Sequence, residues 1–146
     1  MGGGVADGRG GALIAGTANA VLYAFVIGRI LFAFFHLASG LNHFKSIGQY
    51  AEHAGSKGVP APKLAVLGSG ALLIIGGSSI LLGYSPLVGI AALVLFYVGV
   101  TPVMHNFWAA PPEQKQAEMI NFMKNVALTG ATLMFAIIPR PWPLSL

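Results

Sequence analysis

An apolar stretch of the chain, residues 28–45, carries three basic side chains at seven-residue steps. They are Arg29, His36 and His43. Seven residues make almost two turns of an α-helix, so the three side chains share one face. A polar face on an otherwise apolar helix is stable in lipid only where it meets protein, water or a ligand. The stretch therefore predicts a membrane-spanning helix whose polar face is covered by other helices.

Charged residues are rare throughout the chain. Of its 146 residues, 55% are hydrophobic and 8% are charged, whereas soluble domains carry about 25% charged residues. Such a composition cannot cover the surface of a soluble protein, which excludes that class. The absence of cysteine excludes disulfides, cysteine-ligated iron–sulfur clusters and covalently attached haem. The chain is therefore predicted to be an all-α integral membrane protein.

Four apolar segments are long enough to cross a bilayer as helices, which takes about 20 residues each. Glycine and proline residues stand between these segments and mark the loops. The sequence predicts a flexible, glycine-rich tail followed by one domain, a four-transmembrane-helix bundle. The expected boundaries are residues 1–16 for the tail and 17–146 for the bundle, with helices at about 17–43, 64–82, 87–105 and 119–138.

Lysine is distributed unevenly over the predicted topology. The five lysines all lie in or beside the loops after the first and third helices, whereas the termini carry two arginines. Because positively charged loops are retained in the cytoplasm, we expect these two loops to be cytoplasmic and both termini to be external. The protein is expected in the cell membrane, in contact with the lipid bilayer. Basic residues that anchor helices to phospholipid account for the net charge of +4, so no nucleic-acid partner is expected.

Most polar residues of the predicted spans lie near the ends that face these loops. His43 and His105 end the first and third helices, and Lys124 and Asn125 begin the fourth. His36 lies two turns deeper, about 10 Å at 1.5 Å per residue. We expect the three histidines to approach one another near this interface, around a cavity that opens toward the loops. Taken singly, each side chain is also explained as a polar helix end in contact with water.

Arg29 has no candidate for an ion pair within the predicted spans, because all four acidic residues lie outside them. A lipid-facing arginine at mid-bilayer costs about 3 kcal/mol on insertion scales. We therefore expect Arg29 to face the bundle interior or a partner. Its guanidinium must then use backbone carbonyls, water, an anionic lipid, a ligand or another subunit.

The candidate binding site consists of Arg29, His36, His43 and His105, and its ligand stays open. A quinone or an anion is one possibility, because imidazole can hydrogen-bond a quinone carbonyl and carry its proton. A haem b held by His105 with His36 or His43 is another. No metal site is expected, since no third or fourth ligand is well placed beside these histidines. No pair of side chains indicates a catalytic acid and base.

Several motifs stand in a fixed order from about residue 20 onward. They are Arg29, Gly40-Leu41-Asn42-His43-Phe44-Lys45, Gly58-Val59-Pro60, Leu81-Leu82-Gly83, His105-Asn106-Phe107-Trp108, Lys124-Asn125 and Gly130. Their order and spacing over most of the chain resemble the DoxX family of small four-span membrane proteins. Family members typically carry a glutamate early in the second helix, where this chain has Gly68-Ser69-Gly70-Ala71. Because this acid is missing, we expect the compensating group of Arg29 from outside the chain: a lipid phosphate, a ligand or a neighbouring subunit.

Three functions are compatible with these features. The resemblance implies a link, in some members, to redox complexes and to quinone-dependent oxidation of sulfur compounds. The first function is therefore a non-catalytic accessory subunit of a membrane redox or respiratory complex, packed against other membrane subunits or a second copy through small-residue helix faces. The second is a quinone-binding or haem-binding redox protein. The third is a small transporter of anions or amphiphiles, in which Arg29 binds an anion.

Overall fold

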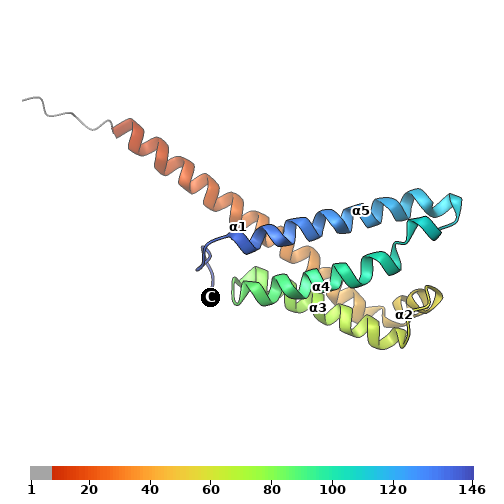
Figure 1. Ribbon diagram of the computed structural model, residues 1–146. Coiled ribbons are helices and arrows are strands. Elements are labelled where there is room, and N and C mark those ends of the chain that lie inside the picture. The colour runs from red at the N-terminus through yellow and green to blue at the C-terminus, as the bar shows by residue number, and fades with distance from the viewer. Residues whose placement is uncertain (1–7) are drawn as a thin grey trace, which may run out of the picture.

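Helices make up the regular structure of the described part of the protein. The structure, a computed structural model, describes residues 8–146 (Figure 1). Four of its helices are long and apolar enough to cross a membrane. This confirms the prediction of an all-α integral membrane protein built as a four-transmembrane-helix bundle. In chain order the elements are α1 (Gly8–Lys45), α2 (Ile47–Ser56), α3 (Pro62–Leu82), α4 (Pro86–Met104), the short 3-10 helix η1 (Phe107–Ala109), α5 (Pro112–Met134) and the 3-10 helix η2 (Phe135–Ile137).

Two helices begin earlier than the sequence predicted. α1 starts at Gly8, so residues 8–16 are helical where a flexible tail was expected. Residues 1–7 of that expected tail lie outside the described residues. The helix extends this far because no proline interrupts it, and each internal glycine weakens it by only about 1 kcal/mol. α5 starts at Pro112 rather than near residue 119, because proline is favoured at the first helical position.

Glycine residues allow α1, α3 and α4 to pack closely. A Cβ atom at Gly76 of α3 would lie 2.4 Å from Leu93 Cγ of α4. One at Gly77 would lie 2.9 Å from Leu37 Cγ of α1. A larger side chain therefore does not fit at either position unless a neighbour moves. In lipid, small residues of this kind let helix backbones approach each other, and here they hold three helices in contact.

Aromatic side chains close the end of the bundle near the C-terminus. Phe25 and Phe32 of α1 lie against Phe135, with ring centroids 6.4 and 5.1 Å apart. Trp142 packs edge-on against Phe25 at 5.6 Å and is only 2% exposed. Residues 139–146, which we call the C-terminal strap, therefore lie back across this end of the bundle. We refer to it below as the closed end.

The opposite end of the bundle is open. α2 packs against α3 at this end, while α5 packs against α4. Near the closed end α1 packs on Phe135 of η2, which follows α5, and in Figure 1 α1 and α5 diverge away from this end. The site described below lies at this end of the bundle.

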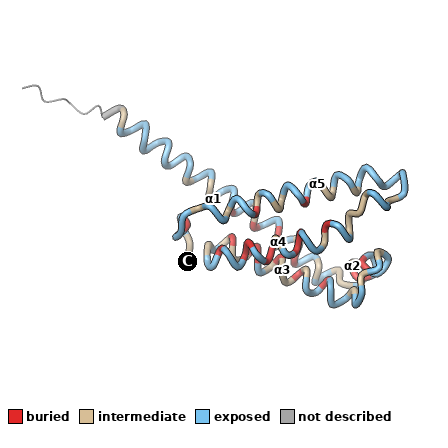
Figure 2. Tube along the Cα trace, in the orientation of Figure 1, coloured by how far each residue is buried: buried red, intermediate tan, exposed pale blue. Residues whose placement is uncertain are grey.

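α1 is much longer than its partners in the bundle. At 1.5 Å per residue its 38 residues measure about 57 Å, whereas the 21 residues of α3 measure about 32 Å. The first part of α1, residues 10–24, projects beyond the other helices and is mostly exposed (Figures 1 and 2). We call this segment the α1 arm. Its exposed apolar side chains, among them Leu13, Ile14 and Val21, require contact with lipid or with another membrane protein.

Candidate functional site

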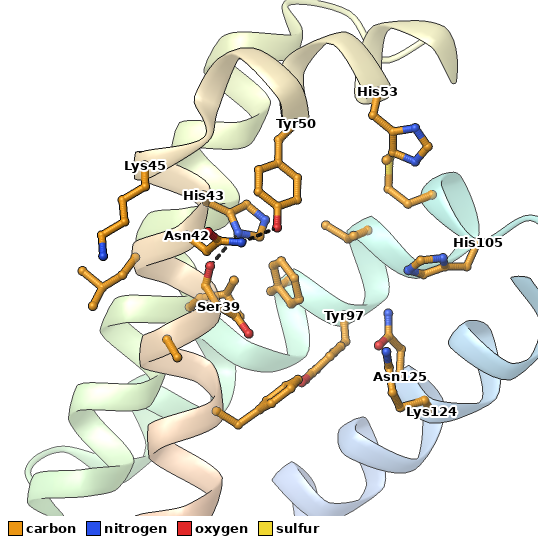
Figure 3. Close-up of a pocket in the computed structure, with 17 residues that line it drawn as sticks. Ser39, Asn42, His43, Lys45, Tyr50, His53, Tyr97, His105, Lys124 and Asn125 are labelled. Carbon is orange, nitrogen blue, oxygen red and sulfur yellow. Dashed lines mark hydrogen bonds between the residues drawn. The ribbon is translucent and has the colours of Figure 1, made fainter. Parts of the chain in front are cut away.

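A cavity of about 770 Å³ lies where α1 and α5 diverge (Figure 3). Residues from all five α-helices line it, so segments far apart in the sequence meet around one space. Its apolar wall includes Phe35, Leu73 and Phe96. Its polar wall consists of Ser39, Asn42, His43, Lys45, Tyr50, His53, Tyr97, His105, Lys124 and Asn125. An apolar space with a set of convergent hydrogen-bonding groups is typical of a small-molecule site.

His36 lies behind the wall of this cavity and is fully buried. Its Nδ1 atom is 2.6 Å from the carbonyl oxygen of Phe32, one turn earlier in α1. Its Nε2 atom is 2.7 Å from the hydroxyl of Tyr97 on α4. The deep histidine thus has partners on both ring nitrogens within its own chain. It reaches the cavity only through Tyr97, which is part of the cavity wall.

His43 repeats the same local arrangement seven residues later. Its Nδ1 atom donates to the carbonyl oxygen of Ser39 over 2.8 Å. Its ring stacks on Tyr50 of α2, with centroids 4.6 Å apart and planes only 8° from parallel. The Asn42 amide donates to the Tyr50 hydroxyl over 2.8 Å. These contacts fix α2 against the end of α1 and place the Tyr50 ring at the cavity wall.

His105 lies on the opposite side of the cavity, next to α5. Its Nδ1 atom is 2.8 Å from Glu118 Oε2, and both side chains are partly exposed. The contact joins the end of α4 to the first turns of α5, which carries Lys124 and Asn125 further along. It is the one ion pair found among residues 8–146.

Positive charge predominates around the cavity. Lys45 and Lys124 are among the described residues that line it, and no acidic side chain is. Glu118 lies behind His105 and is engaged with it. The cavity therefore favours ligands that are anionic or that carry electron-rich oxygen atoms.

Arg29 lies at the closed end, away from the cavity. It is 4% exposed, so it faces the interior, as the sequence predicted. Its Nη1 and Nη2 atoms donate to the carbonyl oxygens of Pro143 and Leu144 over 2.9 and 3.0 Å. The guanidinium also lies over the ring of Phe25, 5.6 Å from its centroid. We expected the compensating group of Arg29 to come from outside the chain. That expectation was wrong for Nη1 and Nη2, because the C-terminal strap supplies their hydrogen-bond acceptors.

The four predicted site residues are thus divided among three places. His43 and His105 line one cavity, as the chain topology predicted. His36 is one hydrogen bond behind that cavity, and Arg29 is at the other end of the bundle. Sequence reasoning missed Tyr97. The signal that could have identified it is its position, because a tyrosine hydroxyl deep in an apolar span needs a partner as much as His36 does.

Few side chains among the described residues are placed to bind a metal ion or a haem iron. They contain no group of three or more histidine, cysteine, aspartate or glutamate side chains placed to hold a metal ion. His36 would have to give up two hydrogen bonds to become an axial ligand of haem. His43 and His105 each use Nδ1 for a hydrogen bond and keep Nε2 for a ligand.

Comparisons with known proteins agree with this architecture. The model of the DoxX family matches residues 24–106, a range that includes α2, α3, α4 and most of the cavity wall. The chain is also 30% identical over 125 residues to the inner membrane protein YphA of Escherichia coli (strain K12), an alignment covering 84% of this chain and 86% of that protein. No solved structure gives a significant match. The match over more than half of the chain shows that this protein belongs to the DoxX family of integral membrane proteins.

Proposed function

We propose that the protein binds a quinone in the cavity and acts as a quinone-binding subunit of a membrane redox or respiratory complex. The composition of the cavity wall carries this proposal, because imidazole, phenol, amide and ammonium groups line it together with aromatic and aliphatic ones. A quinone needs both, since its ring faces are apolar and its oxygen atoms form hydrogen bonds. The volume of about 770 Å³ also lies within the range of roughly 300–1,000 Å³ found for small-molecule sites.

A second, smaller cavity next to the first favours a ligand that has both a polar and an apolar part. It measures about 270 Å³ and shares His43, Tyr50, Val100 and Met104 with the larger cavity. Its other lining residues are small or apolar: Ala54, Val59, Ala65, Val66, Ser69, Gly99 and Val103. Membrane quinones have a polar head group and an apolar tail. The larger cavity suits the head group, and the smaller one suits the first part of the tail.

The α1 arm supports a role within a complex. This segment, residues 10–24, has few contacts with the rest of the chain and exposes apolar side chains along its length. An exposed apolar helix of this kind favours packing against another membrane protein or a second copy of the chain. A purely accessory role would need only this surface. The cavity is the observation that favours quinone binding over that simpler role. By contrast, a transport role in which Arg29 binds the anion lacks support, since Arg29 lies outside the cavity.

We further propose that the cavity opens toward the cytoplasmic leaflet. The open end of the bundle carries α2 with its flanking residues and the start of α5. Four of the five lysines lie in these segments: Lys45, Lys57, Lys63 and Lys115. Because such loops stay in the cytoplasm, both termini would be external. A quinone would then enter the cavity from the cytoplasmic half of the membrane.

Quinone binding can be tested directly with a blocked cavity. The full chain, reconstituted in lipid nanodiscs, is titrated with a benzoquinone that carries a decyl tail, and the heat of binding is recorded. Ala38 lines the cavity, so Ala38→Trp places an indole inside it and should weaken binding at least tenfold, about 1.4 kcal/mol or more. Ala91 is exposed on α4 and lines neither cavity, so Ala91→Trp is the matched control and should bind like the unmodified protein. Absence of binding by the unmodified protein, or equal binding by Ala38→Trp, would show the proposal to be wrong.

A further inference from the structure

The hydrogen-bond partners of His36 fix where its ring hydrogen lies. A backbone carbonyl can only accept a hydrogen bond, so Nδ1, 2.6 Å from the Phe32 carbonyl oxygen, must carry a hydrogen. The ring is fully buried beside the Phe32 and Phe35 rings, and it takes no part in the ion pair found among the described residues. A charge there would be costly, so the ring is neutral and its Nε2 atom carries no hydrogen.

The state of His36 determines what Tyr97 can offer to a ligand. Because Nε2 of His36 is an acceptor, the Tyr97 hydroxyl donates its hydrogen across the 2.7 Å contact. Tyr97 is also part of the cavity wall. Its oxygen atom therefore has lone pairs left for a ligand but no hydrogen. Toward the cavity, Tyr97 is a hydrogen-bond acceptor only.

His43 of the cavity wall offers the same kind of group. It donates from Nδ1 to the Ser39 carbonyl, so its Nε2 atom accepts when the ring is neutral. His105 is engaged through Nδ1 with the Glu118 carboxylate, which favours a protonated ring, so it is not counted among the acceptors. In Figure 3 the two rings extend toward the cavity from opposite sides. Two acceptor atoms, the Tyr97 oxygen and His43 Nε2, thus line the site.

We propose that the cavity selects the reduced, dihydroxy form of a quinone over the oxidised form. This inference rests on the proposed quinone-binding function and goes beyond it by naming the redox form. A quinol has two hydroxyl groups, which can donate to Tyr97 and to a histidine. An oxidised quinone has only acceptor oxygens, so beside Tyr97 two acceptors would face each other and lose their hydrogen bonds to water. Lys124 and Asn125, which also line the cavity, can donate to oxygens of either form and do not discriminate.

The preference should be measurable as a ratio of two dissociation constants. The full chain in nanodiscs is titrated without oxygen, once with the decyl-tailed benzoquinone and once with its quinol. An unpaired buried polar group is costly, so the quinol should bind roughly tenfold more tightly or better, which corresponds to about 1.4 kcal/mol. Equal affinities, or tighter binding of the quinone, would overturn the selection but leave quinone binding intact. Failure of both forms to bind would overturn the proposed function as well.

Two variants test whether the His36–Tyr97 pair sets the preference. Tyr97→Phe removes the accepting oxygen and should bring the two affinities within about threefold of each other. His36→Leu frees the Tyr97 hydrogen to donate into the cavity, so the preference should shift toward the oxidised form. Tyr84→Phe is the control, because Tyr84 is exposed in the turn between α3 and α4 and lines neither cavity. A quinol preference that survives Tyr97→Phe unchanged would show that Tyr97 does not set it.

Discussion

Arg29 and Pro143 are joined by a 2.9 Å hydrogen bond although 114 positions separate them in the sequence. Together with the neighbouring bond to Leu144, this contact ties the C-terminal strap to α1. Within residues 8–146 this buried arginine has no acidic partner, and carbonyl oxygens at the closed end receive hydrogens from Nη1 and Nη2 instead. Arg29 therefore contributes to the stability of the closed end rather than to the cavity.

Removal of the Arg29 guanidinium should release the strap. Arg29→Ala loses two hydrogen bonds from a charged donor, which should lower the free energy of unfolding by roughly 2–4 kcal/mol. The measurement is thermal unfolding in detergent, followed by circular dichroism. Arg29→Lys should recover only part of the loss, because a single ammonium cannot reproduce the two-armed contact. Arg140→Ala is the control, since Arg140 is exposed and belongs to the same strap. Unfolding of Arg29→Ala at the unmodified protein's temperature would contradict this role.

The contact between α3 and α4 at Gly76 should tolerate no added methyl group. A Cβ at Gly76 would lie 2.4 Å from Leu93 Cγ and 3.2 Å from the carbonyl oxygen of Gly89. We expect Gly76→Ala to lower the free energy of unfolding by about 1–3 kcal/mol through overpacking. Gly68 lies in the same helix with nothing within 4 Å of its Cβ position, so Gly68→Ala should be neutral or stabilising by up to about 1 kcal/mol. Thermal unfolding in detergent compares the two variants. Equal effects of Gly76→Ala and Gly68→Ala would argue against close packing of α3 on α4 at Gly76.

A larger side chain in the small cavity should affect the quinone tail and not its head group. Gly99 lines that cavity, and a Cβ at its position has open space around it. Gly99→Leu should therefore fill the space without displacing helices. The variant should bind the decyl-tailed quinone several-fold more weakly than the unmodified protein does, while its affinity for a quinone without a tail stays the same. Gly130→Leu, on α5 and outside both cavities, is the control. Equal loss of affinity for the tailed and tail-less quinones would place the tail elsewhere.

Labelling of engineered cysteines should reveal the orientation of the bundle. Ser56 at the end of α2 and Leu146 in the strap are both exposed and lie at opposite ends of the bundle. Since the chain has no cysteine of its own, each substitution to cysteine gives a single site. A thiol reagent that does not cross membranes should label Leu146→Cys in intact cells, and Ser56→Cys only after the cells are opened. The reverse pattern would place the cavity on the external side.

The sequence predicted the features that depend on helical spacing and chain topology. The seven-residue steps placed His36 and His43 on one face, and the order of the spans brought His43 and His105 to one end of the bundle. Helical spacing could not predict the hydrogen-bond partners of Arg29. They lie in the proline-rich strap, which has no periodicity and whose path is set by tertiary contacts. The start of α1 was also misjudged, since glycines that suggest a flexible tail in water are tolerated within an apolar helix.

Tyr97 shows a different limit of sequence analysis. Its position deep in an apolar span indicates that its hydroxyl needs a partner, but only the structure identifies that partner as His36. The same holds for Glu118, whose pairing with His105 depends on how α5 turns back along α4. Both residues belong to pairs that form between helices, and pairing across helices has no signature in a single sequence.

Photolabelling would test most directly whether the cavity is a quinone site. The full chain in nanodiscs is exposed to a benzoquinone with an azide on its ring, irradiated and digested, and the modified peptides are identified by mass spectrometry. We expect label within residues 35–45 of α1 and within residues 96–105 at the end of α4, which together form most of the cavity wall. This label should be lost in Ala38→Trp. Label confined to the exposed α1 arm, or unchanged by Ala38→Trp, would show that the quinone only dissolves in the surrounding lipid and would contradict the account.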